Sequence, residues 1–251
     1  MKLVQFVYKS NPSDVRAGIL KGDSVVDINK ADSSLPSTVL EILRNGDIGK
    51  VKRLQSSSAA LVPLSSVDLA APVHGVDKVL CVGLNYKDHC EEQKLTPPEV
   101  PMIFSKFSST INGPKDAVKL RTQVTDKVDW EVELTVVIGK QASNSMDTFC
   151  PIGPCITTSD EIGDPQNLEI KCSINGVLKQ KSRTDQLVHK IPTIIERLTS
   201  VMTLLPGDII LTGTPGGVGM YRDPPEYLKP GDVIHSEIQN IGVLETRVQA
   251  F

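Results

Sequence analysis

Acidic and apolar residues alternate between positions 128 and 134, and a run of β-branched residues follows them up to Ile138. A period of two is typical of a β-strand, so the pattern predicts a strand over residues 128–140. Side chains two positions apart point to the same side of a strand. One predicted face is therefore acidic and carries Asp129, Glu131 and Glu133. The opposite face is apolar and is expected to enter the core through Trp130, Val132 and Leu134.

The acidic face is a candidate metal site. Carboxylates on one face repel one another, and when partly buried they protonate, pair with cations or bind a metal ion. A site made of oxygen atoms suits Mg²⁺, Mn²⁺ or Ca²⁺. The alternative is a solvated acidic face on an edge strand, which is the ordinary state of carboxylates. The β-branched run that follows the acidic residues is typical of the centre of a sheet and favours the metal site.

A second candidate group lies at residues 84–93, which lack proline and glycine and are predicted to form a short helix after a strand at residues 79–83. His89 and Glu92 are three residues apart, so they would be neighbours on one helix face. A carboxylate beside an imidazole makes the ring more basic and orients it, which prepares a general base that activates water. The alternative is a surface helix with a solvated histidine.

A glycine-rich loop at residues 213–219 follows a predicted buried strand at residues 209–212. Such a loop brings backbone N–H groups and the Thr214 hydroxyl close to an anion or a carbonyl group. It is not a nucleotide-phosphate loop, because it lacks the Lys-Ser/Thr ending, and no predicted helix follows it as in a dinucleotide site. Lys106, after a predicted strand at residues 102–104, is a candidate contact for an anionic ligand, although solvated lysines are commoner.

The rest of the chain divides into two parts. Residues 1–70 contain short predicted strands and a predicted helix at residues 36–44, and are expected to form a small α+β domain. Residues 71–251 are expected to form a larger domain of short strands broken by proline and glycine. Within it, the Asn-Gly pair at residues 175–176 predicts a type I′ hairpin. Apolar residues at helical spacing predict a helix over residues 191–202.

Composition narrows the class of protein. The chain has 251 residues, 39% of them hydrophobic, which is enough for a well-buried core. The net charge is −3 without a basic stripe, and no apolar run could span a bilayer, so neither nucleic acid nor a membrane is an expected partner. Five cysteines without a C-x-x-C pair are expected to be reduced thiols of an intracellular protein. The N-terminus resembles neither a signal nor a transit peptide, so we expect the cytoplasm, with the mitochondrion as the alternative after removal of a transit peptide.

Four ordered motifs carry a family resemblance: VGLNYKDH at residues 82–89, DWEVEL at 129–134, DTFCP at 147–151 and LTGTPGGVG at 211–219. Together they closely resemble the fumarylacetoacetate hydrolase family, over about residues 73–251. The resemblance implies a mixed, β-rich α+β fold with a rolled central sheet beside the small N-terminal domain. It also implies a homodimer, a divalent cation (Mg²⁺, Mn²⁺ or Ca²⁺) and a small 2-oxo or dicarbonyl acid as substrate.

The same resemblance implies roles for individual residues. Glu131 and Glu133 resemble two of the family's metal ligands, whereas Asp129 does not stand at a ligand position. His89 and Glu92 resemble the catalytic pair that activates water, which the family carries on a mobile lid. The candidate substrate-binding residues are Thr214, Gly213, Tyr86 and Lys106.

The implied function is that of a metal-dependent enzyme. It would cleave a carbon–carbon bond in an acylpyruvate-type 1,3-dicarbonyl acid by hydrolysis, or decarboxylate a 2-oxo acid such as oxaloacetate. In both reactions the metal ion chelates the substrate and stabilises an enolate oxygen. Two alternatives from other classes stay open. One is a catalytically impaired binding or scaffold protein with the same fold, and the other is a cysteine hydrolase that uses Cys90.

The sequence departs from the family between Lys140 and Asp147. The family has a further strand here with a third metal aspartate, and then a loop with a catalytic lysine. Only six residues separate the two positions in this chain, too few for both elements. Either the segment is deleted, which would impair the enzyme, or the sequence joins two parts across a missing stretch. Two carboxylates and water would hold Mg²⁺ weakly, because the ion prefers a near-octahedral shell of oxygens.

Overall fold

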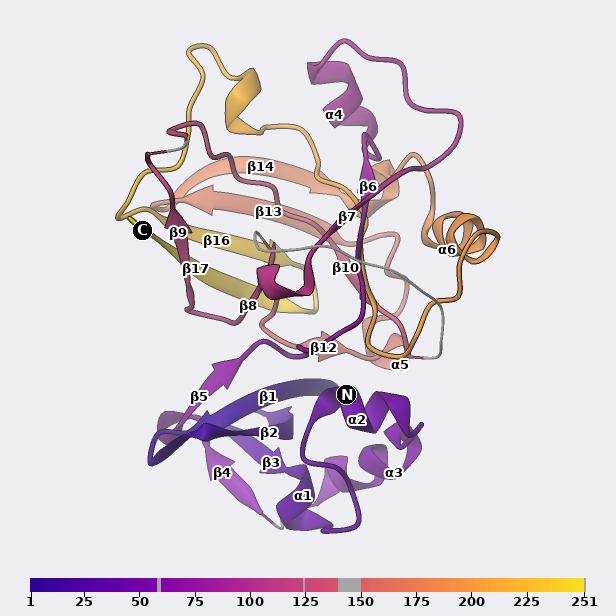
Figure 1. The fold of residues 1–251 in the computed structure, drawn as a ribbon, viewed down its shortest axis with the longest axis vertical. Coiled ribbons are helices and arrows are strands. Elements are labelled where there is room, and N and C mark those ends of the chain that lie inside the picture. The colour runs from indigo at the N-terminus through magenta and orange to yellow at the C-terminus, as the bar shows by residue number, and fades with distance from the viewer. Residues whose placement is uncertain (58–59, 124, 140–149, 251) are drawn as a thin grey trace.

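The computed structural model of the chain describes residues 1–57, 60–123, 125–139 and 150–250. An N-terminal sheet with helices α1–α3 forms the lower part in Figure 1, and the other sheets lie above it. The strand-rich α+β class predicted from the sequence is confirmed. The domain boundary after residue 70 stays a prediction. Strand β12, from the part of the chain after this boundary, pairs with β1 and so joins the N-terminal sheet.

The N-terminal sheet has the strand order β12-β1-β2-β3-β4, with β5 on β1, and its pairings are antiparallel. Apolar side chains of the sheet and its helices form one core cluster, in which Leu3 and Ile42 are fully buried. The predicted helix at residues 36–44 starts at Val39, because the Glu41 N–H donates to the Thr38 hydroxyl and caps it. The bounds are β1 Lys2–Tyr8, β2 Asn11–Lys21, β3 Ser24–Asp27, β4 Leu61–Pro63, β5 Val67–Ala70, β12 Ile156–Thr157, α1 Ile28–Ala31, α2 Val39–Arg44 and α3 Ile48–Arg53.

A four-stranded sheet of order β10-β15-β6-β7 positions the candidate site. β15 pairs with β6 in parallel, so both strands end at the same edge of the sheet. β6 leads from this edge to helix α4, and β15 leads into the glycine-rich loop. The side chains of Leu80, Ile210 and Ile194 pack together in one cluster and join this sheet to helix α6. The bounds are β6 Val79–Gly83, β7 Met102–Lys106, β10 Thr135–Val137, β15 Ile209–Leu211, α4 Lys87–Glu92 and α6 Ile191–Thr199.

A five-stranded sheet has the order β14-β13-β16-β17-β9 and contains the predicted hairpin. Asn175 and Gly176 have φ values of 52° and 79°, which are positive as a type I′ turn requires, so the hairpin prediction is confirmed. The sheet packs on Trp130 through Ile170, which is fully buried. The bounds are β9 Ala117–Leu120, β13 Glu169–Ile174, β14 Val177–Arg183, β16 Val233–Ile238 and β17 Gly242–Ala250.

Short elements connect the sheets. Two short strands, β8 and β11, form a parallel pair, and one four-residue helix precedes β13. Five 3₁₀ turns occur among the described residues. The bounds are β8 Ile111–Asn112, β11 Cys150–Pro151, α5 Ser159–Ile162, η1 Leu54–Ser56, η2 Leu64–Ser66, η3 Ser108–Thr110, η4 Thr184–Gln186 and η5 Gly219–Tyr221.

The strand predicted over residues 128–140 is wrong in its length. Only Thr135–Val137 form a strand, and the seven residues before them pair with no neighbouring strand. The Val128 and Leu134 carbonyls accept from the backbone N–H groups of Leu228 and Thr212, and the backbone of Val132 bonds to side chains. The Val132 N–H donates to Oε1 of Gln180 at 3.0 Å, and the Val132 carbonyl accepts from Oγ1 of Thr214 at 3.1 Å. The segment is extended without belonging to a ladder, because these two side chains take the place of a partner strand.

The period of two is nevertheless visible in the burial of this segment. Trp130, Val132 and Leu134 are each 3% exposed, as the alternation predicted. The end of the predicted strand at Lys140 and the first half of the motif at residues 147–151 lie outside the described residues.

Both helices predicted in the larger part exist but are shorter than predicted. The helix predicted at residues 84–93 spans Lys87–Glu92, and the one predicted at residues 191–202 spans Ile191–Thr199. Among the residues that the structure describes, no helix is long and apolar enough to cross a membrane.

Candidate active site

The glycine-rich loop after β15 holds two carboxylates of the predicted site through its backbone. The Gly213 N–H donates to Oε2 of Glu133 at 2.5 Å, and the Gly217 N–H donates to Oε2 of Glu92 at 2.7 Å. Both glycines have positive φ values, of 100° and 101°, a conformation that other residues rarely adopt. A Cβ atom on Gly217 would lie 2.4 Å from the carbonyl oxygen of Lys179, so this position also lacks room for a side chain. The anions that this loop binds are therefore carboxylates of the protein itself.

The same loop binds a third carboxylate, that of Asp129. Oδ1 of Asp129 accepts from the N–H of Gly219, and Oδ2 accepts from the N–H of Met220, both at 2.7 Å. Oδ1 also accepts from the N–H of Trp130 at 2.7 Å. Asp129 therefore fixes the loop, whereas the sequence placed it only as the third acid of one face. Its partners lie 90 and 91 residues along the chain, so no local pattern could have revealed them.

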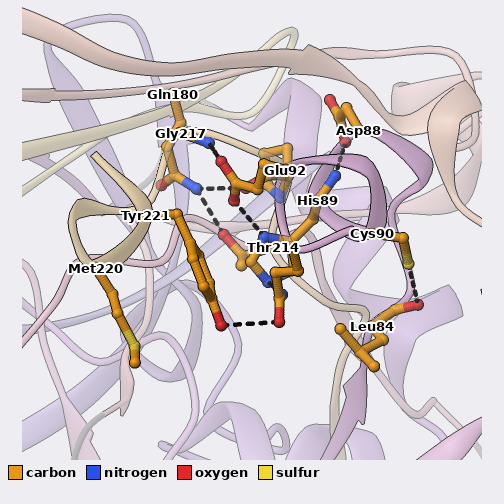
Figure 2. A network of polar contacts seen from close by, with 12 residues as sticks. Leu84, Asp88, His89, Cys90, Glu92, Gln180, Thr214, Gly217, Met220 and Tyr221 are labelled. Carbon is orange, nitrogen blue, oxygen red and sulfur yellow. Dashed lines mark hydrogen bonds and ion pairs between the residues drawn. The ribbon is translucent and has the colours of Figure 1, made fainter. Parts of the chain in front are cut away.

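Helix α4 brings His89 and Glu92 together, as their spacing predicted. Nδ1 of His89 lies 2.6 Å from Oε1 of Glu92, and His89 is 8% exposed (Figure 2). A carboxylate only accepts hydrogen bonds, so the proton of the neutral ring is on Nδ1 and the lone pair is on Nε2. The second oxygen of Glu92 is held by Gly217, which fixes the carboxylate against the loop. The pair has the geometry of an oriented general base.

Glu133 and Glu131 lie in different environments. The pKa of Glu133 is raised to about 7, first by burial and then by repulsion from Glu131, while Lys106 and the Gly213 N–H oppose the rise. Glu131 is exposed. Burial alone would lower the pKa of Lys106, but the combined attraction of Glu133, of the Cys150 and Cys81 thiols and of Glu131 raises that pKa. Lys106, the last residue of β7, therefore interacts with Glu131 and Glu133, which we call the acidic pair, and stays charged.

Thr214 is held by a residue that the sequence did not single out. Gln180 on β14 donates through Nε2 to Thr214 Oγ1 and to the Pro215 carbonyl, each at 2.8 Å (Figure 2). The Thr214 hydroxyl donates its own hydrogen to the Val132 carbonyl at 3.1 Å. Because a hydroxyl has one hydrogen to give, the Thr214 side chain offers a substrate only a lone pair. Gln180 is 1% exposed and links β14, the loop and the acidic segment.

Tyr86 is a buried tyrosine close enough to Glu133 for the two groups to interact electrostatically. It is fully buried, and its hydroxyl has no hydrogen-bond partner among the described residues. Burial raises the pKa of Tyr86, and repulsion from Glu133 raises it further, so the phenol keeps its proton. An uncompensated buried hydroxyl costs about 1–3 kcal/mol, which a ligand oxygen would recover by accepting from it.

The geometry speaks against the cysteine-hydrolase alternative. Cys90 is fully buried, and its thiol donates to the Leu84 carbonyl at 3.4 Å (Figure 2). Burial raises the pKa of the Cys90 thiol, and Asp88 raises it further. A nucleophilic cysteine needs an accessible thiolate. All five cysteines are free, as the sequence predicted.

A divalent cation fits the acidic pair in part. Repulsion within the pair contributes to the raised pKa of Glu133, and a cation between two such carboxylates would relieve it. Among the residues that the structure describes, however, no group of three or more His, Cys, Asp or Glu side chains gathers around one point. A cation at Glu131 and Glu133 would therefore have only these two carboxylates as protein ligands among the described residues, and it would be held weakly.

Comparison with known proteins identifies the family. The profile of the fumarylacetoacetate (FAA) hydrolase C-terminal family matches residues 78–145 and 141–249. The mitochondrial oxaloacetate tautomerase Fahd2a of Rattus norvegicus is 41% identical over 289 aligned positions, which cover 99% of this chain and 91% of the relative. The fumarylacetoacetate hydrolase domain-containing protein 2 homolog of Dictyostelium discoideum is 35% identical, with coverages of 99% and 97%. The chain belongs to the fumarylacetoacetate hydrolase family, whose members among these relatives are enzymes.

Solved structures agree with this assignment. Fumarylacetoacetate hydrolase from the psychrophile Exiguobacterium antarcticum has a TM-score of 0.83 and 29% identity, and the match covers all of both chains. Maleylpyruvate hydrolase from Sphingobium sp. SYK-6, solved with manganese(II) and pyruvate, has a TM-score of 0.80 and 30% identity, covering 100% of this chain and 99% of that one. The mixed, β-rich fold predicted from the family resemblance is confirmed.

The alignments contain a gap on the side of this chain. The alignment with the rat relative has 289 positions, whereas this chain has 251 residues, so at least 38 positions have no counterpart here. The two matched ranges of the family profile overlap at residues 141–145. The segment predicted to be absent falls at the same place, and residues 140–149 lie outside the described residues. The explanation by deletion or by a missing stretch therefore stays open.

The first prediction concerns the pH dependence of stability. The folded-state pKa of Glu133 is raised to about 7 from its usual 4.5, so the stability that this group contributes is present below pH 4.5 and lost as the pH rises through 7. Glutamine does not ionise, so the Glu133→Gln variant should not lose stability in this pH range for this reason. We expect its free energy of unfolding, relative to that of the unchanged protein, to be about 1–3 kcal/mol larger at pH 8 than at pH 5, measured by urea denaturation. Identical pH dependence in the two proteins would contradict the prediction.

Proposed function

We propose that this protein is an enzyme that moves a proton at the carbon beside the ketone of a small 2-oxo dicarboxylic acid, and that it interconverts the keto and enol forms of oxaloacetate. The single observation that supports this most strongly is the base geometry of His89. Glu92 holds the ring proton on Nδ1 at 2.6 Å and leaves the lone pair on Nε2, which accepts from the Gln93 amide at 2.7 Å in a nearly buried position. The names of the tautomerase relatives support the choice of substrate.

The proposed steps balance without any other reactant. After the Gln93 amide N–H leaves Nε2 of His89, this atom takes a proton from the carbon between the two carbonyl groups. The C–H electron pair forms the C=C bond, and the ketone oxygen becomes an enolate. The protonated ring then returns the proton to that oxygen, which gives the enol. Glu92 stabilises the imidazolium that exists between the two steps. In this scheme Lys106 and the Tyr86 hydroxyl, which both interact with Glu133, would bind a substrate carboxylate or the enolate oxygen.

Glu131 and Glu133 would hold a divalent cation in this scheme. When bound there, Mg²⁺ or Mn²⁺ supplies electrostatic stabilisation for negative charge on the substrate oxygens. The manganese and pyruvate in the structure of maleylpyruvate hydrolase support a cation at the corresponding site. The Gly213 N–H keeps one oxygen of Glu133 in place, which leaves the other oxygen for the ion.

Hydrolysis of an acylpyruvate and decarboxylation of oxaloacetate are the further activities that this site would support. Both pass through the same enolate, and hydrolysis adds a water that His89 activates. The second candidate function is a binding or scaffold protein that retains the fold without turnover. The specific observation that favours it is the two-carboxylate site, since no third acidic ligand joins it within the described residues.

We also propose a homodimer in mitochondria. Met102, Phe104 and Phe107 on and after the edge strand β7 are 46–53% exposed, and a second copy of the chain would cover them. Sedimentation equilibrium tests this, and a monomer at micromolar concentration would refute it.

The mitochondrial names of the rat and bovine relatives support that compartment over the cytoplasm that the sequence favoured.

The second prediction tests the base. In Glu92→Gln the new amide donates to Nδ1 of His89 and forces the ring proton onto Nε2, so the lone pair is lost where it is needed. We expect kcat/KM for the conversion of enol to keto oxaloacetate to fall by roughly 10²–10⁴, followed by the loss of enol absorbance in the ultraviolet. The matched control is Glu91→Gln on the same helix, an exposed residue that should leave activity unchanged. Equal activities of the two variants would exclude His89 as the base.

The third prediction tests the cation. Chelation with EDTA should abolish turnover and Mn²⁺ should restore it. In Glu131→Gln one of the two carboxylates is gone, so the Mn²⁺ concentration for half-maximal activity should rise by about tenfold or more. The control is Glu99→Gln, an exposed residue on the connector before β7. Full activity after chelation would exclude the cation, and binding of oxaloacetate without turnover in any metal would favour the scaffold.

A further inference from the structure

The base of the proposed reaction is the first member of a hydrogen-bonded chain that extends beyond the His–Glu pair. Nε2 of His89 lies 2.7 Å from the amide nitrogen of Gln93, the residue after helix α4. The amide oxygen of Gln93 accepts from the Tyr221 hydroxyl at 2.9 Å. Tyr221 stands at the end of the glycine-rich loop, and its ring lies edge-on to His89 with centroids 6.4 Å apart (Figure 2). Gln93 and Tyr221 are 128 residues apart in sequence, so only the fold joins them.

The donors and acceptors of this chain match in one arrangement. Glu92 fixes the ring proton on Nδ1, so Nε2 has a lone pair and accepts from the Gln93 amide N–H. The Gln93 oxygen then accepts from the O–H of Tyr221, a residue that is 44% exposed. Each hydrogen has an acceptor while His89 is neutral. The arrangement therefore selects the neutral ring and the tautomer that the proposed reaction needs.

When Nε2 of His89 is protonated, it becomes a donor and needs an acceptor in place of the Gln93 N–H₂ group. The ring would then point an N–H at the amide N–H₂ group of Gln93, and two donors would face each other. Rotation of the amide by about 180° places Oε1 against the imidazolium and the N–H₂ group against the Tyr221 oxygen. The second arrangement takes the amide acceptor away from the Tyr221 O–H, whose hydrogen must then turn to water, so the hydroxyl favours the first arrangement. The two arrangements differ only in the amide orientation and the hydroxyl rotor.

We propose that the side-chain amide of Gln93 turns by about 180° when His89 becomes protonated. Tyr221 is the positioning residue in this proposal, because its hydroxyl favours one of the two amide orientations. This inference deepens the proposed function and rests on it for the role of His89 as base. The titratable groups that face the ring are Glu92 on α4 and Tyr221 on the loop, while the Asp88 carboxylate accepts from the backbone N–H of His89. Only Tyr221 reaches the ring through Gln93. A purely structural link would hold α4 to the loop without following the charge of the ring.

The loop geometry gives Tyr221 a fixed place for this role. Asp129 binds the N–H groups of the two residues before Tyr221, and Gly217 binds Glu92 from the same loop. One loop therefore holds both ends of the chain, the carboxylate on Nδ1 and the hydroxyl beyond Nε2. A movement of the loop away from α4 would release both contacts together.

The fourth prediction tests this switch on the ring itself, by ¹⁵N NMR of the His89 side chain in the full-length protein, with the signal assigned through His89→Asn. In the unchanged protein we expect the Nδ1–H tautomer when the ring is neutral. Tyr221→Phe removes the hydroxyl that favours the first amide position, so the amide oxygen is freer to accept from the charged ring. We expect the midpoint of the His89 titration to move up by about 0.5–1 pH unit. The acid limb of the pH profile of kcat/KM should move by the same amount.

The controls separate the link from the fold and from the activity. Tyr227→Phe, a partly buried tyrosine on the same connector, should leave the midpoint unchanged. In a Gln93→Leu background, Tyr221→Phe should have no further effect, because the amide is the link. An unchanged midpoint in Tyr221→Phe, or a shift that persists in the Gln93→Leu background, would overturn the inference. If the midpoint shifts as expected but no substrate turns over, the proposed function fails while the switch stands.

Discussion

Backbone N–H groups of a single glycine-rich loop bind three carboxylates, those of Glu133, Glu92 and Asp129. These acids come from two elements, helix α4 and the segment before β10, which would not approach one another without a common partner. N–H groups aimed at carboxylates form charge-assisted bonds, each roughly twice as strong as a neutral one. The parallel pairing of β15 with β6 places the loop and α4 at one sheet edge, so the fold supplies this meeting point. The base, the acidic pair and the loop are fixed by one set of contacts.

The parts of the fold that were predictable are those with local causes. The hairpin at residues 175–176 follows from the positive φ values that asparagine and glycine tolerate, and the burial of Trp130 and Leu134 follows from the period of two. The length of the strand was not predictable. Val132 bonds to side chains 48 and 82 residues away, and only the assembled fold shows that Gln180 and Thr214 replace a neighbouring strand.

The candidate site divides in the same way. The spacing of His89 and Glu92 on a short helix predicted their contact, since three residues are nearly one helical turn. The role of Asp129 in fixing the loop could not be predicted. In the sequence it resembles the neighbouring acids Glu131 and Glu133, and the N–H groups that bind it belong to a distant loop. Gln180, Gln93 and Tyr221 carry no local signal of function, because amides and hydroxyls are common at surfaces. Their meaning comes from what they contact.

The binding of Asp129 to the backbone of Gly219 and Met220 constrains how the loop can change during evolution. Asp129 is bound by the backbone N–H of Met220, and the Met220 side chain itself is 56% exposed. Every amino acid except proline supplies the same N–H group, so this position is free to diversify without loosening the anchor. Its neighbour Gly219 is not free, because a Cβ atom there would lie 2.0 Å from the Glu226 carbonyl oxygen. Relatives are therefore expected to vary the residue at the rim while the glycine before it stays invariant.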